Sequence, residues 1–368
     1  MASPSLKPST DRLALIEHAR NSVFVEKTFA ATPLDPAIER SWRRCLSLGH
    51  QPDAQVTFDA VSKAATSLAL ESNRQLLTAA NPVMEQMAHA MAMTRYFAIL
   101  TDAHGVVINT SGPIDRSDPR ANNIARIGVN LSEAAVGTTA IGAALAEHQS
   151  VWLHRGEHFF ADTAIYSCAG APLFGPLGQC IGMLDLTGVD VPERPELKHL
   201  VEQSARSIEN AMLLQQPYAL LLRFNWPGRG LNIDADALIT LDADGFVTGS
   251  NGVARHLIHM PVTRQSGAMH CSDLFAMPWQ MVFDSALSST GMPMEAPLWS
   301  GLRVSLLAVA LANQYGPAAK TEKAEKTLKV AESDLIRVTL AKTKGNVTEA
   351  ARILGISRAT IYRKLTDH

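Results

Sequence analysis

The sequence has few cysteines and no long apolar run. Its four cysteines are widely spaced along the 368 residues: Cys45, Cys168, Cys180 and Cys271. None forms a Cys-x-x-Cys pair, which argues against a disulfide framework and a zinc ribbon and predicts reduced thiols. Residues 302–312 come nearest to an apolar span, but Arg303 and Ser305 interrupt them, and a membrane helix needs roughly 20 apolar residues. We therefore expect no membrane span, metal or cofactor.

Two further signals are missing. The N-terminus, Met1-Ala2-Ser3-Pro4, lacks the charged-then-apolar order of a signal peptide, so a cytoplasmic location is expected. A Gly-x-x-x-x-Gly-Lys-Ser/Thr motif is also absent, because residues 316–321 have a lysine without the glycine beside it. This argues against a P-loop ATPase. The apolar content of 46% is nevertheless high enough for several domains with cores of their own.

The C-terminal segment has the pattern of two short helices joined by a tight turn. Asn346 is placed to cap the first helix, Glu349 to reach back to that cap, and Gly355 to end the helix. One face of this helix is small and apolar: Val347, Ala350, Ala351 and Leu354. Ser357 can then cap a second helix over residues 358–365. Because small side chains allow two helices to cross closely, the pattern predicts a helix-turn-helix; an ordinary helical hairpin is the alternative.

A third helix, expected over residues 333–343, completes an all-α three-helix unit. Residues 345–365 resemble the C-terminal domain of the Fis family almost continuously. This resemblance implies a homodimer that binds pseudo-palindromic double-stranded DNA with its last helix in the major groove. Charge agrees with this, because residues 318–368 carry 11 Lys and Arg against six Asp and Glu while the whole chain has a net charge of −2.

The predicted DNA-contacting residues lie on and beside the second helix of the pair: Lys344, Ser357, Arg358, Thr360, Tyr362, Arg363 and Lys364. The chemistry of the side chains suits different contacts. Arg358 and Arg363 can each form two hydrogen bonds to guanine, and Thr360 can contact a thymine methyl group. Lys344 and Lys364 suit phosphates.

Two hairpin signals predict two modules that contain sheets. Residues 96–109 hold two apolar runs around the turn Asp102-Ala103-His104-Gly105, and residues 238–248 repeat this order around Asp242-Ala243-Asp244-Gly245. Helices are expected before the first hairpin, at residues 72–93, and between the modules, at 196–216. The second of these helices can pair with its copy in a dimer or pack on its own sheet.

The first module resembles the GAF domain of bacterial activators of acetoin-type catabolic operons. The likeness rests on six segments: residues 41–45, 131–133, 137–142, 157–159, 166–172 and 182–188. The chain departs from that family at Leu131, where a Trp is usual, and at Thr139, where an Asn is usual. The resemblance implies a pocket for a small-molecule effector, with these candidate ligand-binding residues: Thr139, Glu157, His158, Phe159, Tyr166, Cys168 and Asp185.

The second module resembles a degenerate PAS domain, through its hairpin, the helix start at Asn251-Gly252 and an apolar strand near residues 302–310. The expected fold is therefore a multidomain α+β chain. Its predicted parts are an N-terminal helical region (1–72), a GAF-like sensor (73–216), a PAS-like domain (231–312), a linker (313–327) and a Fis-type helix-turn-helix (328–368). Activators of this kind usually carry an AAA+ ATPase where this chain has only the linker.

These expectations favour a transcriptional regulator that is not an enzyme. It would sense a small molecule and control a catabolic operon without ATP-driven remodelling of polymerase. Recruitment of RNA polymerase, occlusion and competition with longer relatives stay open. The alternative is a GAF-type thiol-dependent enzyme, or a redox or metal sensor, that uses Cys168, because Cys180, His154 and His158 are near it in the sequence.

Overall fold

The structure is a computed structural model that describes residues 9–26, 34–58, 60–231, 233–260, 269–287, 292–310, 339, 343 and 347–354. The chain divides into two compact units, Met1–Ala310 and Leu311–His368. The larger unit contains two modules: a first module, residues 9–214, and a second module, residues 218–310. Each module is built on an antiparallel sheet of five strands, which confirms the predicted mixed architecture of two sheets with flanking helices.

The first module has a sheet with the strand order β2-β1-β5-β4-β3. The strands are β1 (Tyr96–Asp102), β2 (Val107–Ser111), β3 (Val151–His154), β4 (Tyr166–Phe174) and β5 (Cys180–Val189). The first two form the predicted hairpin around Gly105, whose φ of 80° a side-chain-free residue adopts without strain. β5 is the last strand in sequence, yet it lies at the centre of the sheet.

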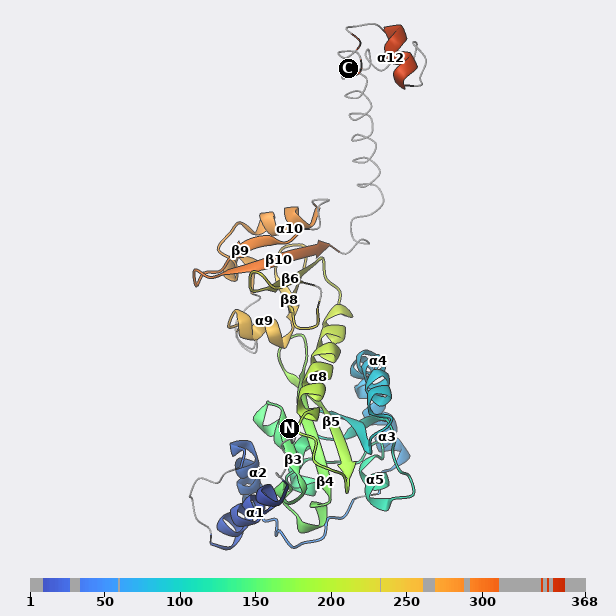
Figure 1. The fold of residues 1–368 in the computed structure, drawn as a ribbon, viewed down its shortest axis with the longest axis vertical. Helices are drawn as coiled ribbons and strands as arrows, with labels where there is room; N and C mark the ends of the chain where they lie inside the picture. The colour runs from blue at the N-terminus through green and yellow to red at the C-terminus, as the bar shows by residue number, and fades with distance from the viewer. Residues whose placement is uncertain are drawn as a thin grey trace, which may run out of the picture. The chain divides into compact units, whose positions relative to one another are not determined.

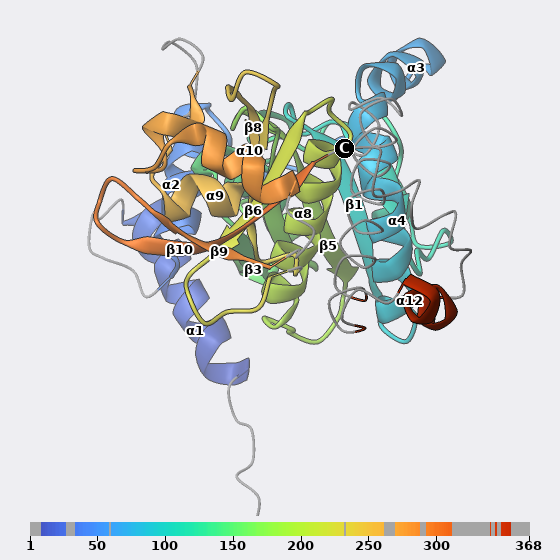
Figure 2. The ribbon, with the colours of Figure 1, turned by 90° about the horizontal axis from the view of Figure 1, so that it is seen from above.

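Helices cover both faces of this sheet. On one face, α4 (Arg74–Met91) and α8 (Leu197–Leu214) lie side by side, and α3 (Lys63–Ser72) precedes them (Figures 1 and 2). α8 therefore packs on its own sheet, as one of the two expectations had it. The opposite face is covered by α5 (Pro119–Ile124), α6 (Glu133–Val136) and α7 (Ala140–Glu147), with short 3-10 turns at Arg155–Glu157 and Ala161–Thr163.

The N-terminal helices join this second covering layer. They are α1 (Ser9–Arg20), the π-helical turn η1 (Asn21–Val25) and α2 (Pro36–Ser47), which Asp35 caps by accepting from the Ala37 amide at 2.9 Å. Ile38 and Trp42 are fully buried in the same core as Phe97 and Ile99 of β1. The N-terminal helical region and the sheet thus share one apolar core.

The second module has the strand order β8-β7-β6-β10-β9. Its strands are β6 (Leu220–Asn225), β7 (Ala237–Leu241), β8 (Val247–Ser250), β9 (Met294–Pro297) and β10 (Arg303–Ala310). One face carries α9 (Gly252–Leu257), the 3-10 turn η4 (Cys271–Asp273) and α10 (Trp279–Leu287). Asn251 caps α9 by accepting from the Ala254 amide, which confirms the helix start predicted there.

The C-terminal half of α8 joins the two modules (Figure 1). Leu213 packs against Leu221 and Leu238 on the open face of the second sheet. The Asn251 side chain donates to the side-chain oxygen of Asn210 at 2.8 Å. One helix therefore belongs to both modules.

The smaller unit contains α12 (Val347–Leu354), the first helix of the predicted pair. Ala350 and Ala351 are buried, with Val347 and Leu354 packed beside them, so the apolar face predicted for this helix is confirmed. The linker, the second helix of the pair and the predicted DNA-contacting residues, Lys344 and 357–364, lie outside the described residues. Within the part of the chain that the structure describes, no helix is both long and apolar enough to span a membrane.

Candidate ligand cavity

A small cavity of about 30 Å³ lies in the first module, between the sheet and the layer that contains α5 to α7. Its lining is mostly apolar and comes from both layers: Phe58, Ile99, Ile124, Leu131, Val136, Thr139, Ala140, Ile141, His158, Thr163, Tyr166, Cys168, Asp185 and Thr187. A water molecule needs roughly 10–15 Å³ of such space. The cavity as it stands therefore has room for only about two or three waters, and a larger ligand must displace part of its wall.

The polar side chains of the cavity come mainly from two neighbouring strands. Tyr166 and Cys168 are two positions apart on β4, and Asp185 and Thr187 are two positions apart on β5. Because side chains two positions apart in a strand share a face, all four point to the same face of the sheet. The register places Cys168 directly opposite Thr187. The alternation that buries Leu184 and Leu186 under α4 and α8 thus turns Asp185 and Thr187 into the cavity.

In the part of the chain that the structure describes, one carboxyl oxygen of Asp185 has no hydrogen-bond donor. The side chain is fully buried, and its Oδ2 atom is hydrogen bonded to the Thr187 hydroxyl. The other oxygen, Oδ1, is the one without a hydrogen-bond partner among the described residues. Burial raises the pKa of Asp185 to about 7, so near neutral pH a large fraction of this group is protonated. An unpartnered buried acceptor that faces a cavity is a place for a ligand that donates a hydrogen bond.

Asp185, Thr187, Cys168 and His158 form a continuous polar chain. Thr187 Oγ1 lies 3.3 Å from Cys168 Sγ, which lies 3.5 Å from Nε2 of His158. The other ring nitrogen of His158, Nδ1, lies 2.9 Å from the carbonyl oxygen of Arg155. If protonated Asp185 donates to Thr187, each next group can donate to its neighbour, from Thr187 to Cys168, then to His158 and finally to the carbonyl. Every member of the chain is then uncharged.

The pKa shifts agree with an uncharged chain. Burial lowers the pKa of His158 to about 4, which keeps the imidazole neutral near pH 7. Burial, with the nearby Asp185, raises the pKa of the Cys168 thiol well above its ordinary value. A catalytic cysteine requires the opposite shift, since the thiolate is the nucleophile. The site therefore lacks the activated thiol on which the enzyme alternative depends.

The remaining predicted residues divide into those at the cavity and those behind it. Thr139 lines the cavity, but its hydroxyl already caps α7 by accepting from the Gly142 amide at 3.1 Å. The Tyr166 hydroxyl donates to the carbonyl of Arg120 at 3.1 Å. Glu157 and Phe159 are not among the lining residues. Cys180, at the start of β5, does not line the cavity either, and its thiol faces the carbonyl of Gly182.

Glu157 and Phe159 instead attach the N-terminal helices to the turn that carries His158. The carboxylate of Glu157 accepts two hydrogen bonds from Arg12 of α1, at 2.8 and 3.0 Å, although burial raises its pKa to about 7. The Phe159 ring packs edge-on against Phe24. Arg20 donates to three carbonyls of this turn, those of residues 156, 158 and 159, at 2.9, 2.7 and 3.0 Å.

Arg20 and Trp42, which were not among the predicted site residues, both hydrogen bond to the turn that carries His158. The Trp42 indole donates to the carbonyl of Glu157 at 2.8 Å. Trp42 stands in the segment 41–45 that carried part of the family likeness, so a signal for it existed. The sequence contained no such signal for Arg20, because the residues to which it hydrogen bonds lie 136 to 139 positions away. Among the described residues, no group of three or more His, Cys, Asp or Glu side chains is arranged to hold a metal ion.

Two family descriptions match the chain. "MimR, N-terminal domain" matches residues 16–210, which is more than half of the chain and includes α2, the whole first sheet and the cavity. "Bacterial regulatory protein, Fis family" matches residues 327–368. The second match confirms the Fis-type segment predicted at the C-terminus.

Named relatives are transcriptional regulators. The acetoin catabolism regulatory protein of Cupriavidus necator is 27% identical over 264 residues, which cover 70% of this chain and 39% of the relative. The propane 2-monooxygenase operon transcriptional activator MimR of Mycolicibacterium goodii is 27% identical over 180 residues, 48% of this chain and 30% of the relative. The chain thus matches well under half the length of these relatives. The predicted likeness to activators of acetoin-type operons is confirmed.

Among solved structures, the E. coli DhaR(N)–DhaL complex contains a chain that is similar over its full length and over 76% of this chain. The sequence identity is 16% and the TM-score is 0.46.

Proposed function

Because the chain belongs to the family defined by the MimR N-terminal domain, we propose that it is a transcriptional regulator of a catabolic operon. It binds double-stranded DNA through residues 327–368 and responds to a small molecule in the cavity of the first module. The observation that carries this proposal is the presence, in one chain, of a Fis-family segment and a domain whose buried cavity holds an unpartnered carboxyl oxygen.

The DNA-binding part of the proposal rests on the Fis-family segment. The first helix of the predicted helix-turn-helix pair, α12, buries the face of small side chains that a close helix crossing requires. The segment is basic in a chain whose net charge is −2, so phosphate attraction is concentrated in this segment. We propose that Arg358, Arg363 and Thr360 read bases, that Lys344 and Lys364 hold phosphates, and that the protein acts on DNA as a homodimer.

The regulator acts without ATP-driven remodelling of polymerase. The sequence has no P-loop motif, and the region between the second module and the Fis-type segment is too short for an ATPase domain. Occlusion of a promoter requires only DNA binding. Recruitment of RNA polymerase requires DNA binding and a protein surface that contacts the polymerase. Purified protein that hydrolysed ATP and opened promoter complexes would contradict this part.

A salt titration of DNA binding tests the first part. Full-length protein is titrated with DNA from around its own gene and with scrambled DNA. We expect selective binding that Arg358→Ala or Arg363→Ala weakens by about 5-fold to about 150-fold, because each removes a base contact of about 1–3 kcal/mol. Lys364→Ala should instead reduce the slope of log affinity against log salt by about one unit. Arg303→Ala is the matched control, since Arg303 is an exposed arginine that pairs with Glu295 in the second module.

The outcome that contradicts DNA binding is equally clear. If Arg358→Ala and Arg363→Ala bind the gene's own DNA as tightly as Arg303→Ala does, the Fis-type segment does not provide the base contacts.

The cavity supports a class of effector. The lining is apolar apart from a chain of uncharged polar groups, so a charged ligand would lose its hydration without a counter-charge. The free Oδ1 atom of Asp185 is an acceptor whether or not the group is protonated at Oδ2, so its partner must donate a hydrogen bond. We propose a small neutral molecule that carries a hydroxyl group, such as a hydroxy ketone or an alcohol.

Acetoin and diacetyl test this class as a matched pair, because they differ by a hydroxyl group against a carbonyl. Binding to full-length protein is measured by calorimetry. We expect acetoin to bind and diacetyl to bind at least about tenfold more weakly, since Asp185 would be left unpaired. Asp185→Ala should remove the preference between the two. A preference for diacetyl, or an unchanged preference in Asp185→Ala, would count against Asp185 as the anchor.

A further inference from the structure

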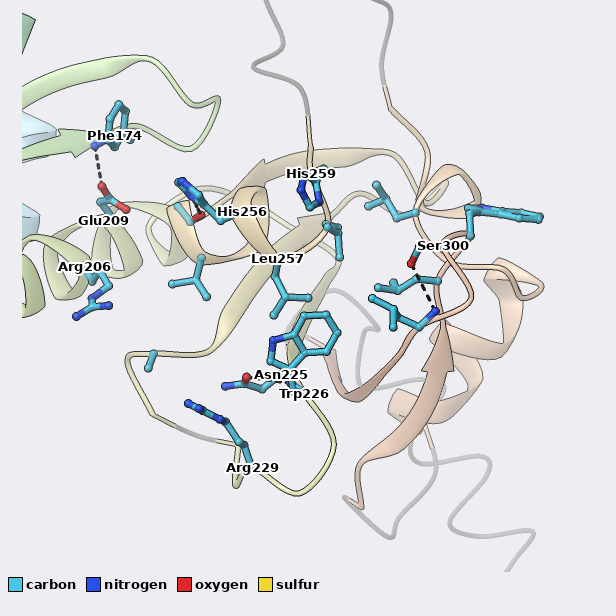
Figure 3. Close-up of a pocket in the computed structure, with 18 of the residues that line it drawn as sticks. Phe174, Arg206, Glu209, Asn225, Trp226, Arg229, His256, Leu257, His259 and Ser300 are labelled. Carbon is cyan, nitrogen blue, oxygen red and sulfur yellow. Dashed lines mark hydrogen bonds between the residues drawn. The ribbon is translucent and has the colours of Figure 1, made fainter. Parts of the chain in front are cut away.

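A second and much larger hollow, of about 1000 Å³, lies on the second module where α8 meets it. Figure 3 shows its walls: α9 and the residues that follow it, the end of β6, the turn between β9 and β10, and Arg206 and Glu209 of α8. We call this hollow the junction groove. Nothing in the proposed function uses it, and its chemistry differs from that of the cavity.

The junction groove combines an aromatic surface with apolar walls. The indole of Trp226 is 38% exposed, although tryptophan is a large apolar side chain that folding usually covers. Leu257 of α9 faces the same space, and Leu298 and Leu302 continue the apolar wall. A flat apolar ligand would cover surface that water now contacts, and each aromatic contact adds roughly 0.5–1.5 kcal/mol beyond that burial.

Two arginines supply positive charge at one end of the junction groove. Arg206 comes from α8 and Arg229 from the segment after β6, and in Figure 3 their side chains extend toward the same end. Neither takes part in the ion pairs that the described residues form, unlike Arg223 nearby, which pairs with Asp236 at 3.2 Å. Two acids also line the junction groove, Glu209 and Asp273. Glu209 accepts a hydrogen bond from the Phe174 amide, and burial raises its pKa to about 7.

We propose that the junction groove is a second ligand site, for a small organic anion with an aromatic body. The carboxylate lies between Arg206 and Arg229, and the ring lies against Trp226. Guanidinium groups bind carboxylates through paired, charge-assisted hydrogen bonds, which lysine or a neutral donor does not match. Such a ligand would contact α8 and α9 together, and therefore both modules.

Binding of naphthoate to the full-length protein tests the site, with naphthamide as a neutral ligand of the same shape. Calorimetry measures affinity, and tryptophan fluorescence reports contact with Trp226. We expect naphthoate to bind and to be favoured over naphthamide. Arg206→Gln and Arg229→Gln should each weaken naphthoate about tenfold or more, because each removes a hydrogen bond to a charged group. Arg303→Gln, an exposed arginine of the same module outside the groove, should leave the affinity unchanged.

Two further variants locate the ligand. Trp226→Leu should weaken naphthoate and naphthamide alike and remove most of the fluorescence change. Asp185→Asn changes the cavity of the first module and should leave naphthoate binding as it is. The proposal is overturned if naphthoate fails to bind at millimolar concentration or if naphthamide binds as tightly. Equal binding in both arginine variants, or a loss in Asp185→Asn instead, would overturn it as well.

Discussion

The hairpins β1–β2 and β7–β8 are built on the same turn in two modules that otherwise differ. In each, an aspartate accepts from two backbone amides: Asp102 from His104 and Val106 at 2.8 and 2.9 Å, and Asp242 from Asp244 and Phe246 at 3.0 and 2.9 Å. The register of each hairpin shifts by one residue beside the turn, where Ile108 of β2 and Thr248 of β8 are the extra residues. Identical turn chemistry therefore produces an identical local structure in both places.

The likeness extends beyond the hairpins to a later chain segment that donates a hydrogen bond to the glycine of each turn. The carbonyl of Gly105 accepts from the Leu131 amide and that of Gly245 from the Cys271 amide, both at 2.9 Å. In both sheets a hairpin lies on each side of one central strand, but that strand is the last in sequence in the first module and the first in the second. The same spatial arrangement is thus reached by two chain orders.

The modules differ in what covers this shared frame. In the first, α5 to α7 cover a cavity of about 30 Å³, and His158 and Asp185 are fully buried. In the second, the hollow is open and about 1000 Å³ in volume, and its histidines His256 and His259 are exposed. The strands of the two modules are arranged alike. The layer that covers each sheet therefore decides which polar side chains are buried and which are exposed to solvent.

The largest expected effect concerns this covering layer. Trp42→Ala removes a fully buried indole that joins α2 to the turn carrying His158, and should lower the free energy of unfolding by about 3–5 kcal/mol. Trp299→Ala, in the open second module where the side chain is 68% exposed, should cost less than about 1 kcal/mol. Denaturant unfolding of both variants measures the difference. Equal losses would mean that the N-terminal helices do not complete the first core.

The next effect concerns equivalent positions after the two hairpins. Asn251 is buried and makes four side-chain hydrogen bonds, to Leu238, Ala254, Asn210 and Asp236, at 2.8 to 3.0 Å. Asn251→Ala should therefore lower the free energy of unfolding by about 2–4 kcal/mol. Ser111 occupies the corresponding place in the first module, and Ser111→Ala should change stability by less than about 0.5 kcal/mol. A small loss of stability in Asn251→Ala would show that α8 does not hold the second module through this residue.

The buried groups of the first cavity should give opposite pH dependences. The folded pKa of Asp185, about 7, exceeds its ordinary 3.8, so between these values the folded chain retains a proton that the unfolded chain releases, and stability falls as pH rises. The folded pKa of His158, about 4, is below its ordinary 6.5, so there the unfolded chain holds the extra proton and stability rises with pH.

Single substitutions separate these two contributions. Asp185→Asn leaves the His158 effect, and the free energy of unfolding should rise by about 2 kcal/mol from about pH 5 to about pH 7, relative to the unmodified chain. His158→Gln leaves the Asp185 effect and should shift the same difference by about 2 kcal/mol in the opposite direction. Urea unfolding at the two pH values measures both. Shifts of the same sign would show that one of the groups is not buried as described.

The smallest effect tests the shared turn itself. Asp102→Ala and Asp242→Ala each remove an acceptor of two backbone amides, of which only that of Val106 is partly buried, so water can largely replace the acceptor and each change should cost about 1 kcal/mol. The two losses should agree within about 0.5 kcal/mol, since the turns share the same hydrogen bonds. Thermal unfolding of both variants is sufficient. A clear inequality would show that the surrounding module, rather than the turn, decides the stability of the hairpin.

Much of the local structure could be predicted from the sequence. The hairpin turns, the cap at Asn251 and the apolar face of α12 all depend on residues within a few positions of one another. The buried face of α8 could also be predicted, because the hydrophobic periodicity of its sequence indicates that face. Of the candidate ligand residues, those on strands, such as Cys168 and Asp185, line the cavity, whereas Glu157 and Phe159 anchor the N-terminal helices behind it.

The sequence by itself determined the local elements and the family resemblances, because turn chemistry, helix caps and hydrophobic period act between near neighbours. Only the tertiary structure decided that Arg20 holds the His158 turn from 138 residues away. It alone left one oxygen of Asp185 unpartnered and brought Arg206 to the same groove as Arg229. The reason is that burial and pKa depend on the side chains that packing brings together, and no local pattern specifies those partners.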